Sequence, residues 1–488
     1  MNAIDYFFEN SSHLEKQFLV GKEEITYKDL YNEILKLASW LRKEVGTGKN
    51  IIILSANNIF MLKAYLAVIK SENVCIPLDP RIENDNFEYI ATLTEPSMIL
   101  LTDDIMKRLP LSNYRCVLPA DIEGIEDYKE SDFNYDTDTE ECAEIIFTSG
   151  STGEPKGVMI SHKNLIANTS SIVEYLQLTP DDRMLVVLPF YYCYGLSLLH
   201  THLRVGGSIV FNNSFIFLGR VIQDLLDYEC TGFAGIPSHF QILLRKSDTF
   251  KETTFPHLKY VTQAGGKLAT IFMDEFREAH PEIRFIVMYG QTEATARLSW
   301  LPPELLDERR GSMGRGIPNV ELIVVNENRE KIKPGEIGEV IAKGDNVMMG
   351  YFNDEEGTQK TLRDGWLHTG DLGTVDEDGY IYLTARSKEI IKVRGKRVSP
   401  KEIEAVILEI PGVIDVTISS IDDEIEGEKL KANIVVRKDY KDSLTGEAIK
   451  KHCSEHLALF KIPQVYDIKD NLTITATGKK IKKLHPPK

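Results

Sequence analysis

Helical periodicity is clear near the amino terminus. Leu30, Ile34, Leu37 and Leu41 are spaced so that they share one face of a helix. Thr26 precedes this stripe, and its hydroxyl can accept a hydrogen bond from a backbone N–H of the first turn. The pattern predicts an amphipathic helix that begins after Thr26 and packs its apolar face against a core.

Short apolar runs recur between helical patterns of this kind. Residues 51–54 form one such run, and residues 144–147 and 285–288 are similar. Uninterrupted runs rich in β-branched residues are typical of parallel strands that are buried on both faces. Strands that alternate with helices predict α/β layers over roughly the first four hundred residues.

The pattern changes near residue 370. Residues 375–382 alternate around an Asp-Gly pair, which predicts a β-hairpin. Pro400 stands where a new helical stripe begins, a position that tolerates proline, and residues 413–419 and 430–436 have the pattern of strands. Roughly the last hundred residues therefore predict a small α+β unit.

Length and charge narrow the function classes. The chain has 488 residues and a net charge of −17, from 57 Lys and Arg against 74 Asp and Glu. At roughly 100–200 residues per domain, this length allows about two to four domains. An acidic surface repels a phosphate backbone, which argues against nucleic acid as a partner. A small anionic ligand would need a locally positive site.

Three features indicate the compartment. The six cysteines are scattered, without a C-x-x-C pair or metal-ligand spacing, which favours reduced and mostly buried thiols. The first residues lack a basic segment followed by an apolar run, so no signal peptide is expected. The longest apolar stretch, residues 184–199, is interrupted by Pro189 and Gly195 and is shorter than a bilayer span. We expect a cytoplasmic protein without a membrane span.

A loop rich in hydroxyl groups and glycines follows the strand predicted at residues 144–147. Glycines let a backbone approach a phosphate, hydroxyls donate to its oxygens, and a lysine adds positive charge. The order differs from G-x-x-x-x-G-K-[ST], so this is not the P-loop of kinases and GTPases. A loop of this composition, taken alone, is more often a flexible turn. The residues concerned are Thr148, Ser149, Gly150, Ser151, Thr152, Gly153 and Lys156.

The full run at residues 147–158 resembles the phosphate loop of the superfamily of acyl- and aryl-CoA synthetases, adenylation domains and luciferases. Further signatures of that superfamily follow in the expected order, so the resemblance covers nearly the whole chain. They are Gln263-Ala264-Gly265-Gly266-Lys267-Leu268, Tyr289-Gly290-Gln291-Thr292-Glu293, Gly335-Glu336-Ile337-Gly338-Glu339, Met349-Gly350-Tyr351, Thr369-Gly370-Asp371, Arg386, Lys388, the run from Ile391 to Gly395, and Gly478-Lys479. Within the superfamily, the chain is most like a stand-alone AMP-dependent acyl-CoA synthetase.

The resemblance implies a site for ATP and Mg²⁺. Tyr289 would stack on adenine, Thr292 would donate to the α-phosphate, and Glu293 would hold Mg²⁺, a hard cation that prefers oxygen ligands. Asp371 would accept from the ribose hydroxyls, and Arg386 would bind the ribose and phosphate side. Each residue alone has a plainer interpretation, as part of a turn or as a surface charge. The other nucleotide-site residues would be Gly265, Gly266, Lys267, Gly290 and Gln291.

The resemblance also implies roles in catalysis. A carboxylate that attacks the α-phosphate meets a second anion, and Lys479 between them would stabilise the transition state by on the order of 2.7–4 kcal/mol. The alternative is that Lys479 is one solvated lysine of a basic tail. Lys388 occupies the hinge position, where a torsion change would rotate the C-terminal domain. After that rotation Gly395 would leave room for a pantetheine arm. Tyr192 would guard the acyl tunnel, where many relatives have histidine or another aromatic residue.

The architecture implied by the resemblance has two domains. Residues 1–387 would form an AMP-binding domain of layered α/β subdomains with a β-rich subdomain. Residues 388–488 would form a small, mobile α+β domain that carries the catalytic lysine. The active site would lie between them, where Lys156, Arg386 and Lys479 supply positive charge for ATP within an acidic protein.

The implied reaction converts a carboxylic acid and ATP to acyl-AMP and pyrophosphate, then passes the acyl group to CoA and releases AMP. One alternative is an acyl-AMP ligase that loads the phosphopantetheine thiol of a separate carrier protein, including a stand-alone amino-acid adenylating enzyme. Another is a nucleotide-binding protein without catalysis.

Residues 196–203 contain no acidic residue to pair with a substrate ammonium, which favours an uncharged fatty, short-chain or aryl acid. His200 and His202 in that run are expected to be structural. A monomer and a homodimer both remain open.

Overall fold

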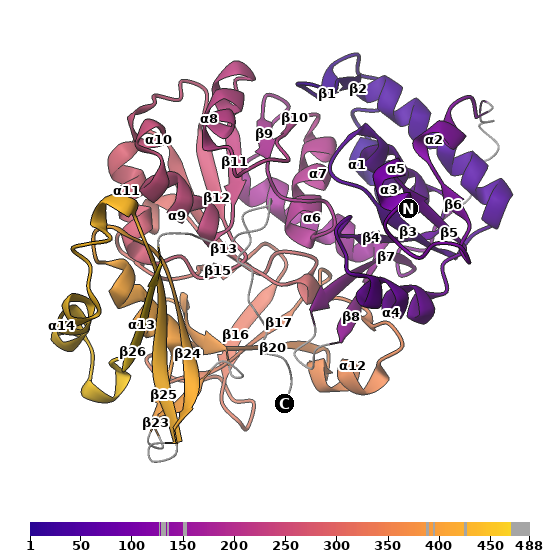
Figure 1. The fold of residues 1–488 in the computed structure, drawn as a ribbon. Helices are drawn as coiled ribbons and strands as arrows, with labels where there is room; N and C mark the ends of the chain where they lie inside the picture. The colour runs from indigo at the N-terminus through magenta and orange to yellow at the C-terminus, as the bar shows by residue number, and fades with distance from the viewer. Residues whose placement is uncertain are drawn as a thin grey trace.

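Two large mixed sheets with helices against them make up most of the molecule (Figure 1). The computed structural model describes residues 1–125, 127, 133, 136–149, 154–386, 390–393, 396–423 and 427–469. Within these ranges, the larger sheet has nine strands in the order β15-β14-β13-β12-β11-β9-β10-β1-β2. They are β1 (Gln17–Leu19), β2 (Ile25–Thr26), β9 (Arg183–Val186), β10 (Ser208–Phe211), β11 (Gly232–Gly235), β12 (Tyr260–Gln263), β13 (Arg284–Tyr289), β14 (Ser299–Leu301) and β15 (Arg315–Gly316).

The second sheet, in the same described ranges, has seven strands in the order β18-β8-β7-β4-β3-β5-β6. They are β3 (Asn50–Leu54), β4 (Val74–Leu78), β5 (Met98–Leu101), β6 (Cys116–Val117), β7 (Cys142–Ser149), β8 (Pro155–Ser161) and β18 (Gly350–Tyr351). The strand predicted at residues 51–54 is β3, which pairs in parallel with β4 and β5 and is buried along most of its length, as the uninterrupted apolar run predicts.

The two other predicted strands are present, but their surroundings differ from the expectation. Residues 144–147 lie in β7 and residues 285–288 lie in β13. Each strand has one parallel neighbour and one antiparallel neighbour: β4 and β8 for β7, and β12 and β14 for β13. The all-parallel environment is therefore wrong for these two strands. An apolar run reports burial on both faces and does not report the direction of the next strand.

Helix α1 contacts α3, α6 and α7, and α7 also contacts α6 and two strands of the larger sheet, β9 and β10. The helix predicted after Thr26 is α2: the Thr26 side chain accepts a hydrogen bond from the Asp29 backbone N–H, and Leu30, Ile34, Leu37 and Leu41 are buried. The helices of the first 250 residues or so are α1 (Ala3–Phe8), α2 (Tyr27–Val45), α3 (Ile59–Lys70), α4 (Asn84–Thr94), α5 (Asp103–Met106), α6 (His162–Leu176), α7 (Cys193–Val205), α8 (Leu218–Asp227), α9 (Pro237–Lys246) and α10 (Asp248–Glu252).

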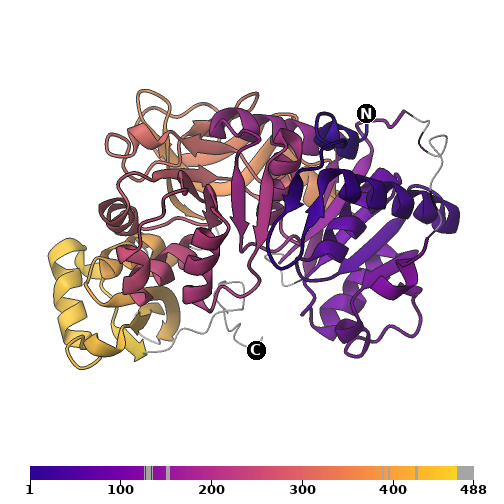
Figure 2. The same ribbon diagram turned by 90° about the horizontal axis from the view of Figure 1, so that it is seen from above.

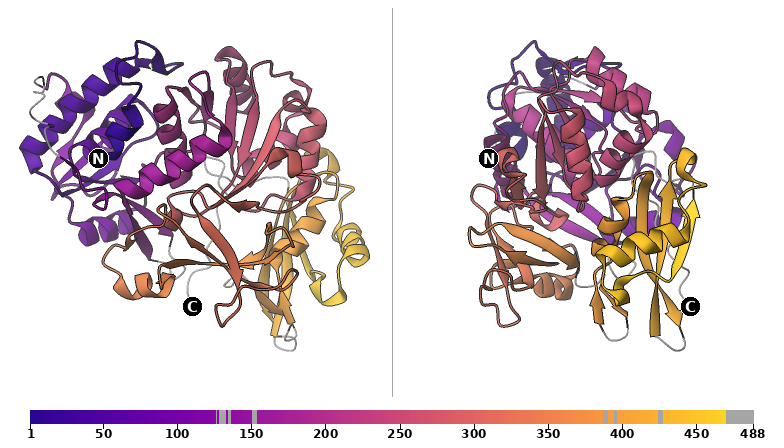
Figure 3. Two further views of the ribbon diagram at one scale, coloured as in Figure 1. Left: turned by 180° about the vertical axis from the view of Figure 1, so that it is seen from behind. Right: turned by 90° about the vertical axis from the view of Figure 1, so that its left-hand side faces the viewer.

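A third, antiparallel sheet has its own core, and Figure 3 shows it beneath the two large sheets. The hairpin predicted at residues 375–382 joins two of its strands, with Val375 opposite Ile381. The sheet therefore supplies the β-rich part of the expected fold. Its elements, with the neighbouring helix α12 (Glu355–Thr361), are β16 (Glu321–Val325), β17 (Gly338–Lys343), β19 (Leu362–Arg363), β20 (Trp366–Val375) and β21 (Ile381–Arg386). Helix α11 (Thr270–Ala279), which lies between β12 and β13 in the chain, contacts α9 and α10.

The last elements form a small α+β lobe, on the side of the molecule opposite the amino-terminal sheet (Figure 2). The helix predicted from Pro400 and the strands predicted at 413–419 and 430–436 are confirmed. The predicted domain boundary between residues 387 and 388 falls outside the described residues. The elements are β22 (Ile391–Val393), β23 (Lys396–Val398), α13 (Pro400–Leu408), β24 (Val413–Asp423), β25 (Gly427–Val436), α14 (Gly446–His456) and β26 (Val465–Lys469).

No helix among the described residues is both long and apolar enough to span a membrane. The apolar stretch at residues 184–199 is divided between β9 and α7, and most of it is buried in the core.

Arg245 of α9 joins the small lobe to the larger sheet. Its guanidinium donates to the carbonyl of Val413 at 3.1 Å and lies 3.5 Å from the carbonyls of Leu408 and Ile410. Glu275 of α11 balances its charge, with Nε to Oε2 at 2.8 Å. The side chain is only 9% exposed, so these carbonyls have little water to replace the arginine.

Replacing this arginine tests how firmly the lobe is docked. In an Arg245→Met variant the free energy of unfolding should fall by about 1–3 kcal/mol, because buried hydrogen-bonding groups lose their partner. Amide hydrogen exchange at residues 408–413 should become faster. Arg277→Met is the control, since its ion pair with Asp307 is more exposed and should contribute roughly 0–1 kcal/mol. Equal effects of the two variants, measured by urea denaturation and hydrogen exchange, would contradict this role.

Candidate active site

The carboxyl ends of three strands carry predicted site residues. Tyr289 ends β13, Gln263 ends β12 and precedes the Gly265-Gly266 turn, and Ser149 ends β7. In open α/β sheets, ligands bind beyond the carboxyl ends of the strands. β12 and β13 belong to the larger sheet and β7 to the second sheet, so each motif lies at the carboxyl end of a strand, where a ligand site is expected.

Asp371 connects two of the predicted nucleotide-binding residues. Its Oδ2 accepts a hydrogen bond from the Tyr289 hydroxyl at 2.7 Å, and its Oδ1 accepts from Nε of Arg386 at 3.0 Å. The strands fix this arrangement, because Asp371 of β20 lies directly opposite Arg386 of β21. Asp371 is buried and Arg386 is mostly exposed. Burial raises the pKa of Tyr289 well above its usual range, so the hydroxyl remains a donor.

Glu293 is held by a residue that the motif alone did not connect with it. The Tyr351 hydroxyl donates to Oε1 of Glu293 at 2.8 Å, and the Met348 N–H donates to the Glu293 carbonyl at 2.9 Å. The side chain is only partly buried, and Oε2 remains as a second carboxylate oxygen. A carboxylate of this kind fits Mg²⁺, which prefers oxygen ligands.

Thr292 begins a short 3₁₀ turn, Thr292–Ala294, which ends at Thr295 with a φ of +55°. Its Oγ1 lies 3.5 Å from Sγ of Cys193, the first residue of α7. Tyr192 is the N-cap residue of α7, and its ring packs against Tyr191 with centroids 4.7 Å apart. The predicted acyl-site residue and the predicted phosphate-site residue therefore lie at adjoining places.

The predicted glycines fill positions that a larger side chain could not. A Cβ on Gly290 would lie 2.0 Å from the carbonyl oxygen of Ala296, far inside van der Waals contact. Gly265 has a φ of +80°, in the left-handed region that favours glycine. The Gln263 side chain secures this turn by donating to the Gly266 carbonyl at 2.8 Å.

Two further predicted residues, Lys267 and Gln291, form hydrogen bonds that involve backbone carbonyls. Nζ of Lys267 donates to the carbonyl of Leu383 in β21 at 2.8 Å, which ties the turn after β12 to the third sheet. The Gln291 carbonyl accepts from the Ala294 N–H at 3.0 Å and closes the turn that contains Thr292 and Glu293.

The phosphate-loop motif connects the hairpin strands β7 and β8, with Thr148 opposite Lys156. Lys156 is already paired: its Nζ donates to Oδ2 of Asp354 at 2.6 Å and lies 4.7 Å from the centre of the Tyr351 ring. Lys156 holds the pKa of Asp354 below its usual range. The composition of the loop gave no sign of this partner, which lies 198 residues away.

Several predicted residues lie outside the described residues, and their roles remain predictions. They are Gly150, Ser151, Thr152, Gly153, Lys388, Gly395 and Lys479, together with the side chain of Ser149.

A buried polar cluster surrounds Glu144 of β7, four residues before Thr148 in the chain. The Tyr65 hydroxyl donates to Oε2 of Glu144 and also lies 2.8 Å from Nε2 of His200. His200 stacks on Phe7 with centroids 4.6 Å apart. Burial raises the pKa of Glu144 to about 7 and lowers that of His200 to about 3. His200 is therefore a neutral core residue, in agreement with its predicted structural role.

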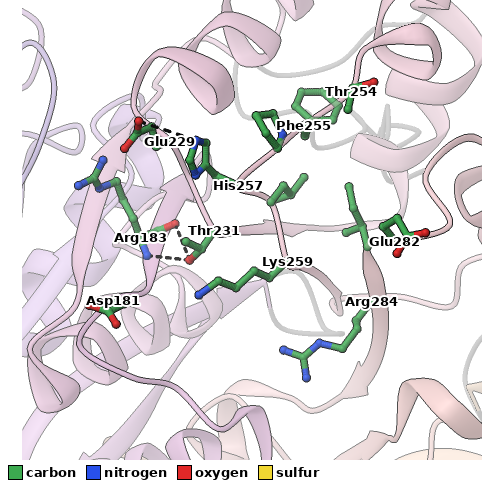
Figure 4. A pocket seen from close by; sticks show the side chains of 13 residues that line it. Asp181, Arg183, Glu229, Thr231, Thr254, Phe255, His257, Lys259, Glu282 and Arg284 are labelled. Carbon is green, nitrogen blue, oxygen red and sulfur yellow. Dashed lines mark hydrogen bonds and ion pairs between the residues drawn. The ribbon is translucent and has the colours of Figure 1, made fainter.

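A groove of about 830 Å³ lies at the opposite edge of the larger sheet, where β9, β11, β12 and β13 begin (Figure 4). Its polar lining mixes cations such as Arg183, Lys259 and Arg284 with Glu229 and Glu282. Of the predicted ATP-site and acyl-site residues that the structure describes, none lines this groove.

Comparison with known proteins agrees with this geometry. The AMP-binding enzyme family matches residues 8–352, and the AMP-binding enzyme C-terminal domain matches residues 402–479. Oxalate–CoA ligase of Arabidopsis thaliana is 30% identical over 478 residues, which cover 94% of this chain and 92% of that protein.

Solved structures share the fold over nearly the whole chain. ATP-bound MatB from Rhodopseudomonas palustris has a TM-score of 0.87 and 25% identity, covering 98% of this chain and 97% of that one. O-succinylbenzoate coenzyme A synthetase (MenE) from Bacillus subtilis, in complex with ATP and magnesium ion, has a TM-score of 0.83 and 24% identity, covering 98% of both chains.

The chain therefore belongs to the AMP-binding enzyme family. It is an adenylate-forming enzyme of the acid–CoA ligase class, which confirms the family, the fold class and the activity predicted from the motifs.

The buried Glu144 predicts a pH-dependent stability. Tyr65 and Cys75 face this carboxyl, His200 contacts the Tyr65 hydroxyl, and burial raises the pKa of Glu144 from 4.5 to about 7. The folded protein therefore holds a proton that the unfolded chain releases, and its free energy of unfolding falls as pH rises from about 4.5 to about 7. At roughly 1.36 kcal/mol per pKa unit, the loss between pH 5 and 8 is about 2–3 kcal/mol.

Glu144→Gln should remove this dependence, because an amide does not titrate in this range. Urea denaturation at pH 5 and pH 8 measures the difference in unfolding free energy between wild type and variant. Glu377→Gln, at an exposed turn position, is the control and should leave the wild-type pH dependence in place. A difference between wild type and Glu144→Gln that stays constant with pH would show that Glu144 titrates normally.

Proposed function

We propose that this protein activates a carboxylic acid with ATP and transfers the acyl group to CoA, at the site that contains Tyr289, Thr292, Glu293 and Asp371. The hydrogen bonds from Tyr289 and Arg386 to Asp371 are the main support. They join the adenine-side and ribose-side residues that the motifs had suggested separately. Asp371 keeps carboxylate oxygens at the place where ribose hydroxyls would bind.

In the first step, a carboxylate oxygen of the substrate attacks the α-phosphorus of ATP. The new P–O bond forms as the bond to the β-phosphate oxygen breaks, and pyrophosphate leaves with the electron pair. Thr292 donates to the α-phosphate oxygens, while the glycine- and hydroxyl-rich loop from Thr148 to Gly153 binds the departing phosphates. In this proposal Lys479 would be placed between the two anions, where its charge would lower their repulsion.

Glu293 would hold Mg²⁺, which neutralises phosphate charge when bound. Its hydrogen bond from Tyr351 supports this role, because the hydroxyl orients one carboxylate oxygen and leaves the other available. MenE from Bacillus subtilis, which shares the fold, has been solved with ATP and magnesium ion.

In the second step, the CoA thiolate attacks the acyl carbon, the C–O bond of the mixed anhydride breaks, and AMP leaves. We propose that the domain of residues 388–488 rotates about Lys388 between the steps and brings Gly395 to the thiol path. The position of Tyr192 beside Cys193 and Thr292 supports a role for its ring at the acyl end of the site.

The acid itself differs among the similar proteins. One acts on oxalate and another on o-succinylbenzoate, so they do not name one substrate for this chain. A product assay with ATP, Mg²⁺ and a mixed pool of acids, with and without CoA, identifies both the acid and the acceptor by mass. Acyl-CoA together with AMP supports the proposal, whereas acyl-AMP without acyl-CoA would redirect it to a carrier-protein thiol.

Replacing Lys479 tests the proposed chemistry directly. Lys479→Ala should lower the rate of acyl-AMP formation by about 10²–10³-fold, because one preorganised charge is lost from the transition state. ATP affinity should change little. Lys480→Ala is the matched control, since it removes a neighbouring lysine of the same basic segment and should leave the rate nearly unchanged. Equal rates for wild type and Lys479→Ala in pyrophosphate exchange would refute the assignment.

A further inference from the structure

Arg297 is a buried cation that the proposed mechanism does not use. Its side chain is among the largest fully buried ones, at 2% exposure. Among the described residues its guanidinium has only neutral partners: the Ala296 carbonyl at 3.2 Å, the Ser197 hydroxyl at 3.4 Å, the Met288 sulfur at 3.4 Å and the Tyr175 hydroxyl. The ring of Tyr194 lies below it, 4.1 Å from the guanidinium carbon.

This set of partners leaves the charge of Arg297 uncompensated. Among the described residues, no carboxylate oxygen lies within 4.0 Å of the guanidinium, whereas Arg245, the other arginine named above as buried, is paired with Glu275. Burying a charge without a counter-ion is costly, and buried charges are normally paired. An anion that arrives with a ligand would supply the missing partner.

The surroundings of Arg297 connect it with the acyl side of the active site. A Cβ on Gly290 would lie 2.8 Å from the Cα of Arg297, so the Arg297 backbone packs directly on the central motif. Helix α7 contacts both ends of this region: Cys193 touches Thr292, and Ser197, one turn later, touches Arg297. The four residues from Cys193 to Ser197 correspond to a rise of about 6 Å along the helix, measured from the end at which the substrate carboxylate would react.

We propose that Arg297 binds a second anionic group of the substrate, and that the substrate is a short-chain dicarboxylic acid. The proposal rests on the proposed function. One carboxylate reacts beside Thr292, and the other pairs with the planar guanidinium, which suits bidentate carboxylate recognition. A spacing of about one helical turn selects a short connecting chain. The sequence of residues 196–203 favoured an acid without a second charged group, because that segment has no acidic residue. The dicarboxylic acid proposed here replaces that expectation, because the positive charge that would bind the second carboxylate belongs to Arg297, outside that segment.

The test compares matched acids on the whole protein. Linear dicarboxylates of three to six carbons and monocarboxylates of the same lengths are assayed one at a time for AMP and acyl-CoA formation. Wild type should prefer a dicarboxylate. Arg297→Met should lower kcat/KM for the preferred dicarboxylate by about 10²-fold or more, mainly by raising KM. The variant should also show a smaller or reversed preference for the dicarboxylate over the monocarboxylate of the same length. Arg297→Lys keeps the positive charge but loses the planar, bidentate guanidinium, so its kcat/KM for the dicarboxylate should lie between those of wild type and Arg297→Met.

Controls separate this role from a structural one. Arg183→Met removes a half-buried arginine from the opposite edge of the same sheet and should leave acid preference unchanged. AMP binding by each variant, measured by calorimetry, reports whether the nucleotide site is intact. A wild-type preference for monocarboxylates overturns the inference while leaving the ligase function in place, whereas absence of AMP formation with every acid counts against both. Equal losses for both acid classes in a folded Arg297→Met variant would make Arg297 structural and refute the inference.

A second inference comes from the small C-terminal lobe. Glu409, at the end of α13, and His452 and His456, one turn apart on α14, present ligand atoms that all lie within 4.8 Å of one another. Two histidines spaced by four residues on one helix, with a carboxylate from a second helix, form a donor set typical of Zn²⁺.

The histidine hydrogen bonds fix which nitrogens can bind a metal. Nε2 of His452 lies 3.1 Å from the Val406 carbonyl, and Nδ1 of His456 lies 2.9 Å from the His452 carbonyl. A carbonyl partner requires N–H on those atoms, which leaves lone pairs on Nδ1 of His452 and Nε2 of His456. Cys453 between them is buried and faces the core. We infer that this cluster binds a divalent transition metal and joins α13 to α14.

Titration of the full protein with Co²⁺ and Zn²⁺, in buffer containing excess Mg²⁺, tests this site. Wild type should show a cobalt absorption band in the visible range and a rise in melting temperature with Zn²⁺. His452→Gln should lower the affinity for both metals by about tenfold or more. His257→Gln, at a separate exposed histidine, should leave the affinity unchanged. Identical titrations for wild type and His452→Gln would exclude the cluster as a metal site.

Discussion

The buried carboxylate of Asp371 is the interaction on which the arrangement of the active site depends. It receives Tyr289 from the end of the larger sheet and Arg386 from the last described residue before the small lobe. One side chain therefore connects β13 of the larger sheet with β20 and β21 of the third sheet, and β21 is the strand that leads toward the C-terminal lobe. A hydrogen bond to an ionised carboxylate is stronger than one between neutral groups, which suits Asp371 to hold three elements in register.

Three ionisable groups near the site differ in how their charge is neutralised. Lys156 is neutralised by Asp354, a pair that also anchors the start of α12. Glu144 avoids a buried charge by keeping its proton near neutral pH. Arg297 can do neither, because a guanidinium does not release its proton and no carboxylate lies beside it among the described residues. Of these three groups, Arg297 is therefore the one whose charge would be neutralised only by a bound ligand.

Local sequence rules accounted for much of the fold. The helix after Thr26, strand β3, the hairpin at residues 375–382 and the helix at Pro400 follow from capping, apolar runs, turn residues and proline chemistry, all of which act within a few residues. The directions of the neighbours of β7 and β13 did not follow, because strand pairing is decided between distant segments. The same limit applies to the site: Tyr351 and Asp354 lie 58 and 198 residues from the motif residues that they contact.

The sequence by itself determined the family, the order of the motifs and the chemical type of each site residue, because glycines, hydroxyls and carboxylates have fixed chemistry wherever they are placed. Only the tertiary structure decided which of these groups meet and which charges are already satisfied. Tyr289 and Asp371 are 82 residues apart, and their contact exists only because the end of β13 meets the middle of β20. The uncompensated charge of Arg297 is likewise visible only after folding, since burial and the absence of a neighbouring carboxylate are properties of packing and cannot be read from any local pattern.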